Sequence, residues 1–317
     1  MKEFPLVSII IPCYKEEKFI EKCLDSVLEQ DYPKDKTEIL VVDGMSKDKT
    51  RDMVKKYQEK YSFLRMLDNL QKFTPFALNT GINNSNGEVI IRLDAHSFYP
   101  KNYVSLCVKN LLESGADNVG GIWKILPKEG TLINKAIVLV SGSFFGGGNA
   151  LYRIGYSKGI KEVDTVFGGC YRKEVFKRIG LYNENLKRSQ DMEFNLRLKK
   201  SGGKIILVPE IFTYYYPKSK LSDFFVHNFE DGIWAVYPLK FVKISFKLRH
   251  YIPLIFVLTF PISIWPYIPA SLFFSFKIAL REKDWKLFFA LPVVFFVRHF
   301  AYGVGSVIGI VKLILGK

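Results

Sequence analysis

The residues with the clearest chemical potential lie at the end of an apolar run. Residues 88–93 read EVIIRL and are followed at once by Asp94-Ala95-His96, which places a carboxylate and an imidazole on one turn. A divalent cation held by one or two such ligands and by phosphate oxygens neutralises a diphosphate, which can then depart. The pattern predicts a site for a nucleotide diphosphate at this strand end, although an Asp here is also typical of a simple helix cap.

A second apolar run ends in the same kind of residue. Residues 39–42 read ILVV and lead into Asp43, and an earlier run over residues 6–11 is stopped by Pro12. In open α/β sheets, ligands bind outside the carboxyl ends of the strands. Tyr14 is suited to lie over a base there, and plain packing explains it equally well. The residues expected to hold the nucleotide are Pro12, Tyr14, Glu16, Asp43 and Asp94.

An acidic pair further along the chain is the candidate for proton transfer. Asp191 and Glu193 lie at the start of a predicted helix over residues 192–200. Free backbone amides at a helix N-terminus stabilise an ionised carboxylate, which suits Asp191 either to a base or to an N-cap. Upstream, Gly168-Gly169 precede another predicted helix over 172–179, and glycines permit close approach of the backbone to a bound sugar.

These motifs, in their order and spacing, resemble the signatures of inverting family 2 glycosyltransferases of the GT-A fold. The matching segments are IIIPCYKEE (9–17), VVDGMSKDKT (41–50), RLDAHS (92–97) and QDMEFNLRL (190–198). Within that family the chain is most similar to membrane-associated exopolysaccharide glucosyltransferases of the succinoglycan type, through residues 94–97, 163–172 and the tail after 250. The resemblance covers nearly the whole chain and is strongest over 6–216.

The resemblance implies roles for individual residues. Asp191 matches the family's catalytic base, which deprotonates an acceptor hydroxyl as that hydroxyl attacks the anomeric carbon. Asp94 and His96 match the metal site, with Mn²⁺ or Mg²⁺ as cofactor. The implied donor is a UDP-sugar or GDP-sugar, and the implied acceptor is a hydroxyl of a lipid-linked saccharide. The candidates for the acceptor site are Gly168, Gly169 and Glu193.

Three positions depart from the family pattern. Lys15 stands where Asn is usual, Gln190 where an acidic residue is usual, and His96 where Asp is common. Imidazole is a competent ligand for Mn²⁺, whereas carboxylate and water suit Mg²⁺ better. The choice between the two metals therefore stays open.

The predicted fold class is α/β, with an open mixed, mainly parallel sheet flanked by helices. We expect the first helix to extend from Tyr14 to about Gln30. Residues 125–165 are rich in glycine and are expected to form an irregular acceptor-site loop. The predicted domains are a catalytic domain over 1–216 (nucleotide-sugar-binding half 1–100, acceptor half 101–216), an amphipathic interfacial segment over 217–250, and hydrophobic membrane segments over 251–317.

The apolar residues concentrate toward the end of the sequence. No charged residue occurs from Tyr251 to Phe276, and few polar residues interrupt 287–315. Each stretch is long enough to cross a hydrocarbon core of about 30 Å, although buried helices of a soluble domain would show the same composition. Prolines within the first stretch are typical of kinked or re-entrant helices.

Charge indicates the expected partners and compartment. The net charge of +15 favours contact with anionic partners, and no nucleic-acid motif is present. Aromatic residues alternate with lysines over 217–250, as in amphipathic helices on anionic membrane lipids, although a face packed on the catalytic domain would look similar. The basic loop 277–286 and the reduced-type spacing of the cysteines favour the cytoplasmic side. We expect the cell membrane, with the catalytic domain in the cytoplasm.

Three alternatives remain at this point. A polyprenyl-phosphate sugar synthase would transfer to an ionised phosphate and would need no base. A processive polysaccharide synthase is disfavoured, because its Gln-x-x-Arg-Trp signature is missing around Trp234, where the chain reads FEDGIW. A non-catalytic protein that binds sugar or lipid on a transferase scaffold would fit the departures at Gln190 and His96.

Overall fold

The computed structural model describes residues 4–242 and 248–315. The chain divides into two compact units, described separately below. Unit 1 comprises Met1–Trp123 and Tyr156–Tyr214, and unit 2 comprises Lys124–Gly155 and Tyr215–Lys317. The division at Tyr215 lies beside the expected boundary at 216. Residues 124–155, which the sequence placed in the acceptor half, instead pack with the C-terminal helices.

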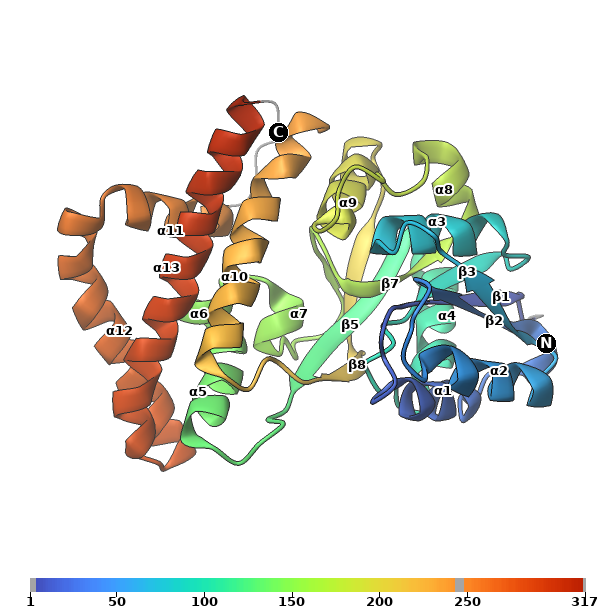
Figure 1. Cartoon of the computed structure of the whole chain (residues 1–317), viewed down its shortest axis with the longest axis horizontal. Helices are drawn as coiled ribbons and strands as arrows, with labels where there is room; N and C mark the ends of the chain where they lie inside the picture. Colours follow the sequence, from blue (N-terminus) through green and yellow to red (C-terminus); the bar gives the residue numbers. More distant parts are fainter. Residues whose placement is uncertain (1–3, 243–247, 316–317) are drawn as a thin grey trace. The chain divides into compact units, whose positions relative to one another are not determined.

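Unit 1 is built on an open sheet with strand order β3-β2-β1-β4-β7-β5-β8-β6 (Figure 1). The strands are Val7–Cys13 (β1), Thr37–Asp43 (β2), Leu64–Asp68 (β3), Val89–Arg92 (β4), Asn118–Ile125 (β5), Lys161–Glu162 (β6), Phe167–Arg172 (β7) and Ile205–Tyr215 (β8). β1 pairs in parallel with β2 and β4, and β2 pairs in parallel with β3. β7 runs antiparallel to β4 and β5. The open, mixed sheet that the family resemblance implies is confirmed.

Helices cover the sheet of unit 1. They are Ile20–Leu28 (α1), Thr50–Lys60 (α2), Thr74–Asn83 (α3), Tyr103–Ser114 (α4), Lys173–Ile179 (α8) and Gln190–Lys200 (α9), with a 3₁₀ turn at Lys34–Lys36 (η1). α1 buries Ile20, Cys23, Leu24 and Val27, the i, i+3, i+4, i+7 spacing of an amphipathic helix. β1 and β2 are buried along nearly their whole length, as expected of parallel strands covered on both faces.

The first helix begins later than predicted. α1 starts at Ile20 and not at Tyr14, because the intervening residues form a loop. Lys15 has φ of 57°, in the left-handed region that Asn adopts more readily than most residues. This geometry accounts for the usual Asn of the resembling family at that position. The backbone N–H of Glu16 donates to Thr50 instead of entering a helix.

Unit 2 is helical. Its helices are Leu132–Ser141 (α5), Phe144–Gly147 (α6), Leu151–Ile154 (α7), Leu221–Val236 (α10), Leu248–Leu258 (α11), Phe260–Glu282 (α12) and Lys286–Ile314 (α13), with a 3₁₀ turn at Tyr237–Lys240 (η2). α12 and α13 are long and apolar enough to be candidate membrane spans. Part of the predicted interfacial segment, residues 243–247, lies outside the described residues.

One expectation about unit 2 is corrected, and the expected break in the first apolar stretch is located. The supposedly irregular stretch over 125–165 contains α5, which begins where the Thr131 side chain accepts a hydrogen bond from the Asn134 N–H. Its apolar positions Ala136, Ile137 and Val140 are fully buried against α13. The uncharged stretch after residue 251 is split at Thr259 into α11 and α12, with Pro261 in the first turn of α12, where a proline fits without breaking a helix.

Candidate active site

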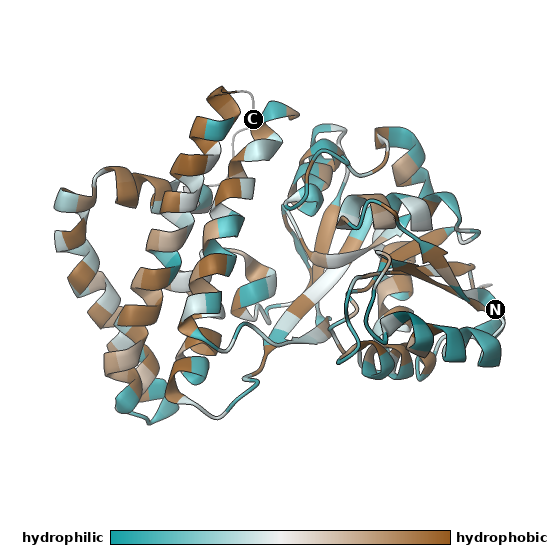
Figure 2. Ribbon diagram, viewed as in Figure 1, coloured by the Kyte–Doolittle hydropathy of each residue, from teal (hydrophilic) through white to brown (hydrophobic). Residues whose placement is uncertain are grey.

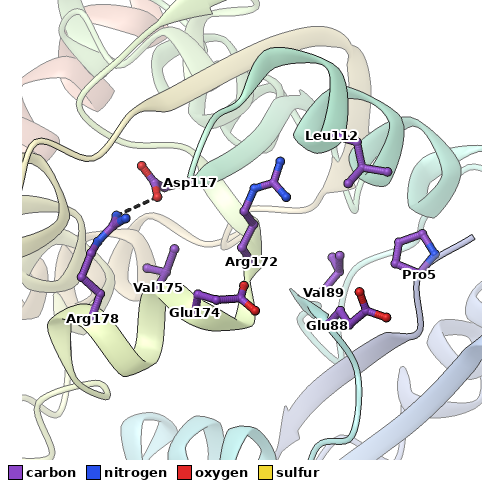
Figure 3. A pocket seen from close by; sticks show the side chains of 9 residues that line it. All are labelled: Pro5, Glu88, Val89, Leu112, Asp117, Arg172, Glu174, Val175 and Arg178. Carbon is purple, nitrogen blue, oxygen red and sulfur yellow. Dashed lines mark hydrogen bonds and ion pairs between the residues drawn. The ribbon is translucent and has the colours of Figure 1, made fainter.

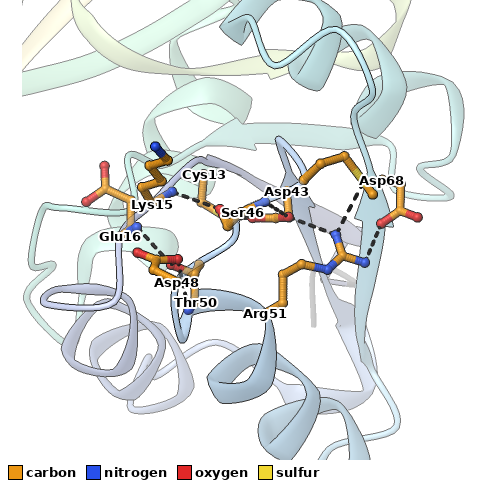
Figure 4. A network of polar contacts seen from close by, with 10 residues as sticks. Cys13, Lys15, Glu16, Asp43, Ser46, Asp48, Thr50, Arg51 and Asp68 are labelled. Carbon is orange, nitrogen blue, oxygen red and sulfur yellow. Dashed lines mark hydrogen bonds and ion pairs between the residues drawn. The ribbon is translucent and has the colours of Figure 1, made fainter.

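The loops after β1 and β2 are joined to each other by hydrogen bonds (Figure 4). The backbone N–H of Lys15 donates to Ser46 Oγ at 2.8 Å, and that of Glu16 donates to Thr50 Oγ1 at 2.9 Å. In the opposite direction, the Lys49 N–H donates to Glu17 Oε2 at 3.1 Å. Residues far apart in the sequence therefore form one ordered rim at the carboxyl ends of these two strands.

Asp43 lies at the centre of this rim and is fully buried. Its Oδ1 accepts from Ser46 Oγ at 2.6 Å and lies 3.6 Å from Cys13 Sγ. Its Oδ2 accepts from the Ser46 N–H at 2.9 Å and from Arg51 Nη1 at 2.8 Å. Arg51 is held on its other side by Asp68 at 2.8 Å. Hydrogen bonding to Asp43 is the main reason why the pKa of Arg51 is raised. Protein donors thus occupy both oxygens of Asp43.

Tyr14 and Pro12 flank the same rim. A Cβ atom added at Gly44 would lie 3.0 Å from Tyr14 Cδ2, so only glycine lets the ring approach the β2 loop this closely. Tyr14 is 39% exposed, and Lys15 Nζ lies 5.3 Å from the centroid of its ring. Pro12 is the residue of β1 that pairs with Val42. Their roles in nucleotide binding stay predictions.

Asp94 lies two residues beyond the end of β4, where Arg92 holds it. Arg92 Nε and Nη2 contact the Oδ1 atom of Asp94 at 3.3 and 3.2 Å, and no described residue donates to its Oδ2. The backbone N–H of Asp94 donates to Tyr99 Oη at 2.7 Å. The Asp94 side chain is 17% exposed. This carboxylate is oriented by the protein and keeps capacity for a further partner.

His96 and Glu16 meet at this strand end. His96 Nδ1 lies 3.2 Å from Glu16 Oε1, which brings the loop after β1 to the loop after β4. A carboxylate on one ring nitrogen is the usual arrangement that orients a metal-ligating histidine. Glu16 was predicted to contact the nucleotide, and the structure places its carboxylate against His96.

Asp191 lies in the first turn of α9. The N-cap position belongs to Ser189, with φ of 59°, and Asp191 Oδ1 accepts from the Met192 N–H at 2.9 Å. The interpretation of Asp191 as the N-cap is therefore wrong. Burial alone would lower the pKa of the Arg92 guanidinium, but the carboxylates of Asp94 and Asp191 raise it above its ordinary value. Arg92 thus lies within the electrostatic reach of both carboxylates.

The acceptor-site candidates fall into two groups. Gly168 has φ of 67°, and a Cβ there would lie 3.0 Å from the Arg92 carbonyl oxygen. With Gly169 it stands beside the end of β4. Glu193 is 2% exposed and accepts from Arg197 Nε at 2.6 Å and Nη2 at 3.0 Å. The structure therefore gives Glu193 an internal partner and brings only the two glycines near Asp94.

Comparison with known proteins identifies the family. The family model described as "Glycosyl transferase family 2" matches residues 8–180. A curated relative from Methanococcus voltae, dolichyl N-acetyl-alpha-D-glucosaminyl phosphate 3-beta-D-2,3-diacetamido-2,3-dideoxy-beta-D-glucuronosyltransferase, is 30% identical and covers 96% of this chain and 97% of its own. The chain belongs to glycosyl transferase family 2.

Two further likenesses agree with this assignment. The succinoglycan biosynthesis protein ExoA of Rhizobium meliloti is 28% identical to this family 2 glycosyltransferase over 71% of the chain and 67% of its own length. The solved structure of the mannosyltransferase PcManGT from Pyrobaculum calidifontis, in complex with GDP-Man and Mn²⁺, superposes with a TM-score of 0.67 at 20% identity. It covers 96% of this chain and 88% of its own. The shared architecture is the GT-A fold that the motifs predicted.

A divalent cation fits the residues at the β4 end of this glycosyltransferase. In the described part of the chain there is no group of three or more His, Cys, Asp or Glu placed to hold a metal. Mg²⁺ and similar cations in nucleotide sites need only one or two protein ligands, because phosphate oxygens and water supply the rest. Asp94, with one oxygen oriented by Arg92, and His96, oriented by Glu16, form such a pair.

Arg92 is the residue that sequence analysis missed. A signal was present, because an arginine at the end of an apolar strand is rarely buried unless it is paired. The spacing of Glu193 and Arg197 likewise predicts an i, i+4 ion pair on a helix. Both signals identify which carboxylates already have protein partners.

A separate cavity lies at the other end of β4 (Figure 3). It has a volume of about 330 Å³ and is lined by Pro5, Glu88, Val89, Leu112, Asp117, Arg172, Glu174, Val175 and Arg178. Asp117 and Arg178 pair across it at 2.6 Å. Val89 begins β4 and Asp94 follows its end, so this cavity is distinct from the acidic site.

Proposed function

We propose that this glycosyltransferase moves a hexose from a nucleotide diphosphate sugar to a hydroxyl of a lipid-linked glycan, with inversion and with a divalent metal. The observation that carries the proposal is the surroundings of Arg92 at the carboxyl end of β4. Asp94 touches it directly, and Asp191 acts on it electrostatically. The contact with Asp94 and the electrostatic effect of Asp191 support the proposal that Asp94 holds the metal and that Asp191 acts as the base.

The residues divide the work of an inverting displacement. Asp191 would accept the proton of the acceptor hydroxyl, so that no covalent intermediate is needed. Arg92 would hold Asp94 in position and keep the two carboxylates from repelling each other. Pro12, Tyr14 and the rim around Asp43 would form the floor for the nucleotide, with Gly168 and Gly169 leaving room for the sugar.

Asp94 and His96 would hold Mn²⁺ or Mg²⁺, which when bound neutralises the departing diphosphate. The support is the fit of this pair together with the family membership. The Pyrobaculum calidifontis neighbour is described with GDP-Man and Mn²⁺. A GDP-sugar or UDP-sugar is therefore the proposed donor.

A lipid-linked acceptor is supported by the relative that spans nearly the whole chain. The Methanococcus voltae protein is named for a dolichyl N-acetylglucosaminyl phosphate substrate. The apolar helices of unit 2 offer a means of reaching such a substrate at a membrane. We place the catalytic unit in the cytoplasm, where its four buried, free cysteines would stay reduced.

A donor and acceptor screen tests the proposal. Full-length protein in detergent is incubated with UDP-sugars or GDP-sugars and a short-chain polyprenyl-linked saccharide, with Mn²⁺, Mg²⁺ or a chelator. We expect a metal-dependent product one hexose heavier, whose anomeric configuration is opposite to that of the donor by NMR. Retention of configuration, or full activity with chelator, would contradict the mechanism. Transfer to polyprenyl phosphate alone would assign the sugar-synthase alternative.

A further inference from the structure

Exposed apolar side chains line α11, α12 and the start of α13. Hydrophobic residues dominate α11, α12 and α13 (Figure 2). Exposed apolar side chains follow the whole of α12 at helical spacing and continue onto the neighbouring helices. The "apolar face" consists of Ile252, Ile255, Leu258, Ile262, Trp265, Ile268, Leu272, Phe273, Phe276, Leu280, Trp285, Phe289 and Val293, each at least 39% exposed. A surface of this extent needs a partner.

The opposite side of α12 is internal to unit 2. Ile278 and Ala279 are buried in a cluster with α13, and Phe274 stacks on Phe145 with centroids 4.7 Å apart. Only 22% of the most apolar window of α12 is buried, against 44% for α13. α12 therefore has one face for protein and one face for another environment.

α13 is covered by helices on several sides. Cβ atoms added at Gly232, Gly305 or Gly309 would lie 2.1 to 2.5 Å from backbone oxygens of the partner helix, so α10 and α13 touch backbone to backbone. Figure 1 shows the two helices side by side. α11 approaches in the same way, because a Cβ at Gly303 would lie 2.2 Å from the Pro253 carbonyl oxygen.

The helices that cover α13 carry charge. On α10, His227 and Asp231 pair at 3.4 Å, and α5 contributes Lys135, which pairs with Asp284 at 3.1 Å. If α13 crossed a bilayer, α10 would enter it as well, and each charged residue at the bilayer centre costs about 2.5–3.5 kcal/mol on insertion scales. α13 is better suited to be the central helix of a unit that stays on one side.

We infer that unit 2 inserts its apolar face into one leaflet of a phospholipid membrane and that neither α12 nor α13 crosses the bilayer. α12, about 34 Å long at 1.5 Å per residue, would lie in the plane of the interface. This inference rests on the membrane attachment proposed above and replaces spanning segments over 251–317 with a one-sided anchor.

Charge and aromatic placement favour lipid over a second protein copy as the occupant. Lys277, Arg281, Lys283 and Lys286 are exposed at the turn between α12 and α13, and basic groups near anionic headgroups contribute about 1 kcal/mol each. Trp265 and Trp285 are 75% and 56% exposed, and tryptophan prefers the membrane interface. A homodimer that packed the two faces in parallel would bring the same cationic turns together.

Depth measurements on vesicles test the orientation of α12. Two single-tryptophan proteins are compared in phosphatidylcholine–phosphatidylglycerol vesicles with lipids brominated near the headgroup or near the chain end. One keeps Trp265, with Trp123→Phe, Trp234→Phe and Trp285→Phe. The other adds Trp265→Phe and Phe273→Trp, which places the probe near the middle of α12. We expect both probes to be quenched at the same shallow depth, whereas a deeper Phe273→Trp probe would overturn the inference.

Labelling across sealed vesicles tests the same point independently. Thr259→Cys and Lys286→Cys flank α12, and the four native cysteines are buried and give little background. Protein is added from outside and treated with a membrane-impermeant maleimide. Both sites should label fully before detergent is added. Protection of one site until lysis would show that α12 crosses.

Introducing negative charge on the apolar face identifies the occupant. We expect the double variant Trp265→Glu, Phe273→Glu to bind vesicles at least about tenfold more weakly, while Leu112→Glu, at an exposed apolar position of unit 1, binds normally. Unchanged vesicle binding combined with loss of a dimer in detergent would assign the face to a second copy and overturn the inference. Nucleotide-sugar binding in detergent is measured on the same variants. If the wild-type protein bound no nucleotide sugar, the proposed function would be refuted and the membrane result would still hold.

Discussion

Asp43 and Asp94 follow apolar parallel strands in the same way but differ in what the protein does with their oxygens. Asp43 is fully buried, and both oxygens have protein donors from Ser46 and Arg51. Asp94 is partly exposed, and only one oxygen is held, by Arg92. The same strand-end motif therefore yields one carboxylate that fixes the architecture and one that keeps capacity for a ligand. Burial and donor count, and not the motif, separate the two.

The largest expected effect is at Asp94. Asp94→Asn should lower turnover by about a thousandfold or more, because metal neutralisation of the leaving group is worth several kcal/mol. Thermal stability should change little, since the Asp94 side chain is partly exposed and the amide oxygen of Asn can still accept from Arg92. Steady-state rates and metal titration by calorimetry check this. Normal turnover in this variant would mean that Asp94, like Asp43, has a structural role.

Asp191 tests whether the second carboxylate near Arg92 acts in chemistry. Asp191→Asn should reduce turnover by about 10² to 10⁴, the usual range for general base catalysis, and leave donor affinity near normal. Asp52→Asn, on an exposed position of α2, is the matched control. Equal losses of donor affinity and of rate would move Asp191 into the nucleotide site.

Substitution of Asp43 should show the opposite pattern. It should lower the free energy of unfolding more than it lowers turnover. Asp43→Asn places an amide donor against the Ser46 N–H and weakens the pair with Arg51. Leaving buried donors unsatisfied costs about 1–3 kcal/mol, so the free energy of unfolding in urea should fall by that amount. An unchanged unfolding midpoint, together with weaker nucleotide binding, would show that Asp43 contacts the ligand after all.

The smallest effect concerns Glu38, at the opposite end of β2 from Asp43. Burial would raise its pKa, but hydrogen bonds from Ser8, Asn86 and Gly87 lower it below the ordinary 4.5. A lowered folded-state pKa means that its stabilisation is present above pH 4.5 and lost as pH falls below that value.

Urea unfolding at several pH values checks this expectation. Glu38→Gln should cost about 1 kcal/mol at pH 7 and progressively less toward acid, whereas the exposed Glu59→Gln should follow the wild type throughout. A Glu38→Gln deficit that persists at low pH would mean that packing, and not ionisation, causes it.

The parts of the fold that sequence predicts well depend on local patterns. β1, β2 and β4 follow from uninterrupted apolar residues. Asp43 and Asp94 follow from what ends such strands, and Asp191 from what begins a helix. Two local signals were present and unused, the apolar run that forms α5 and the spacing of Glu193 and Arg197. The start of α1 could not be predicted, because it depends on Thr50, the first residue of α2.

The site itself is predictable only in its residue types. Asp43 has no spare acceptor because Arg51 reaches it from α2. Asp94 is held on one side because of the direction of the Arg92 side chain. The direction in which α12 faces likewise depends on glycines of α10 and α13 that let neighbouring helices cover one side of unit 2. Such facts come from tertiary contacts between distant segments.

The hydrogen bonds that join the loops after β1 and β2 also affect the thermodynamics of ligand binding. Ordering the backbone of one residue costs about 1–2 kcal/mol of conformational entropy. The amides of Lys15 and Glu16 are already held by Ser46 and Thr50, so this cost is met when the chain folds and not when a nucleotide arrives. A ligand entering between the two loops would keep more of its contact energy as affinity.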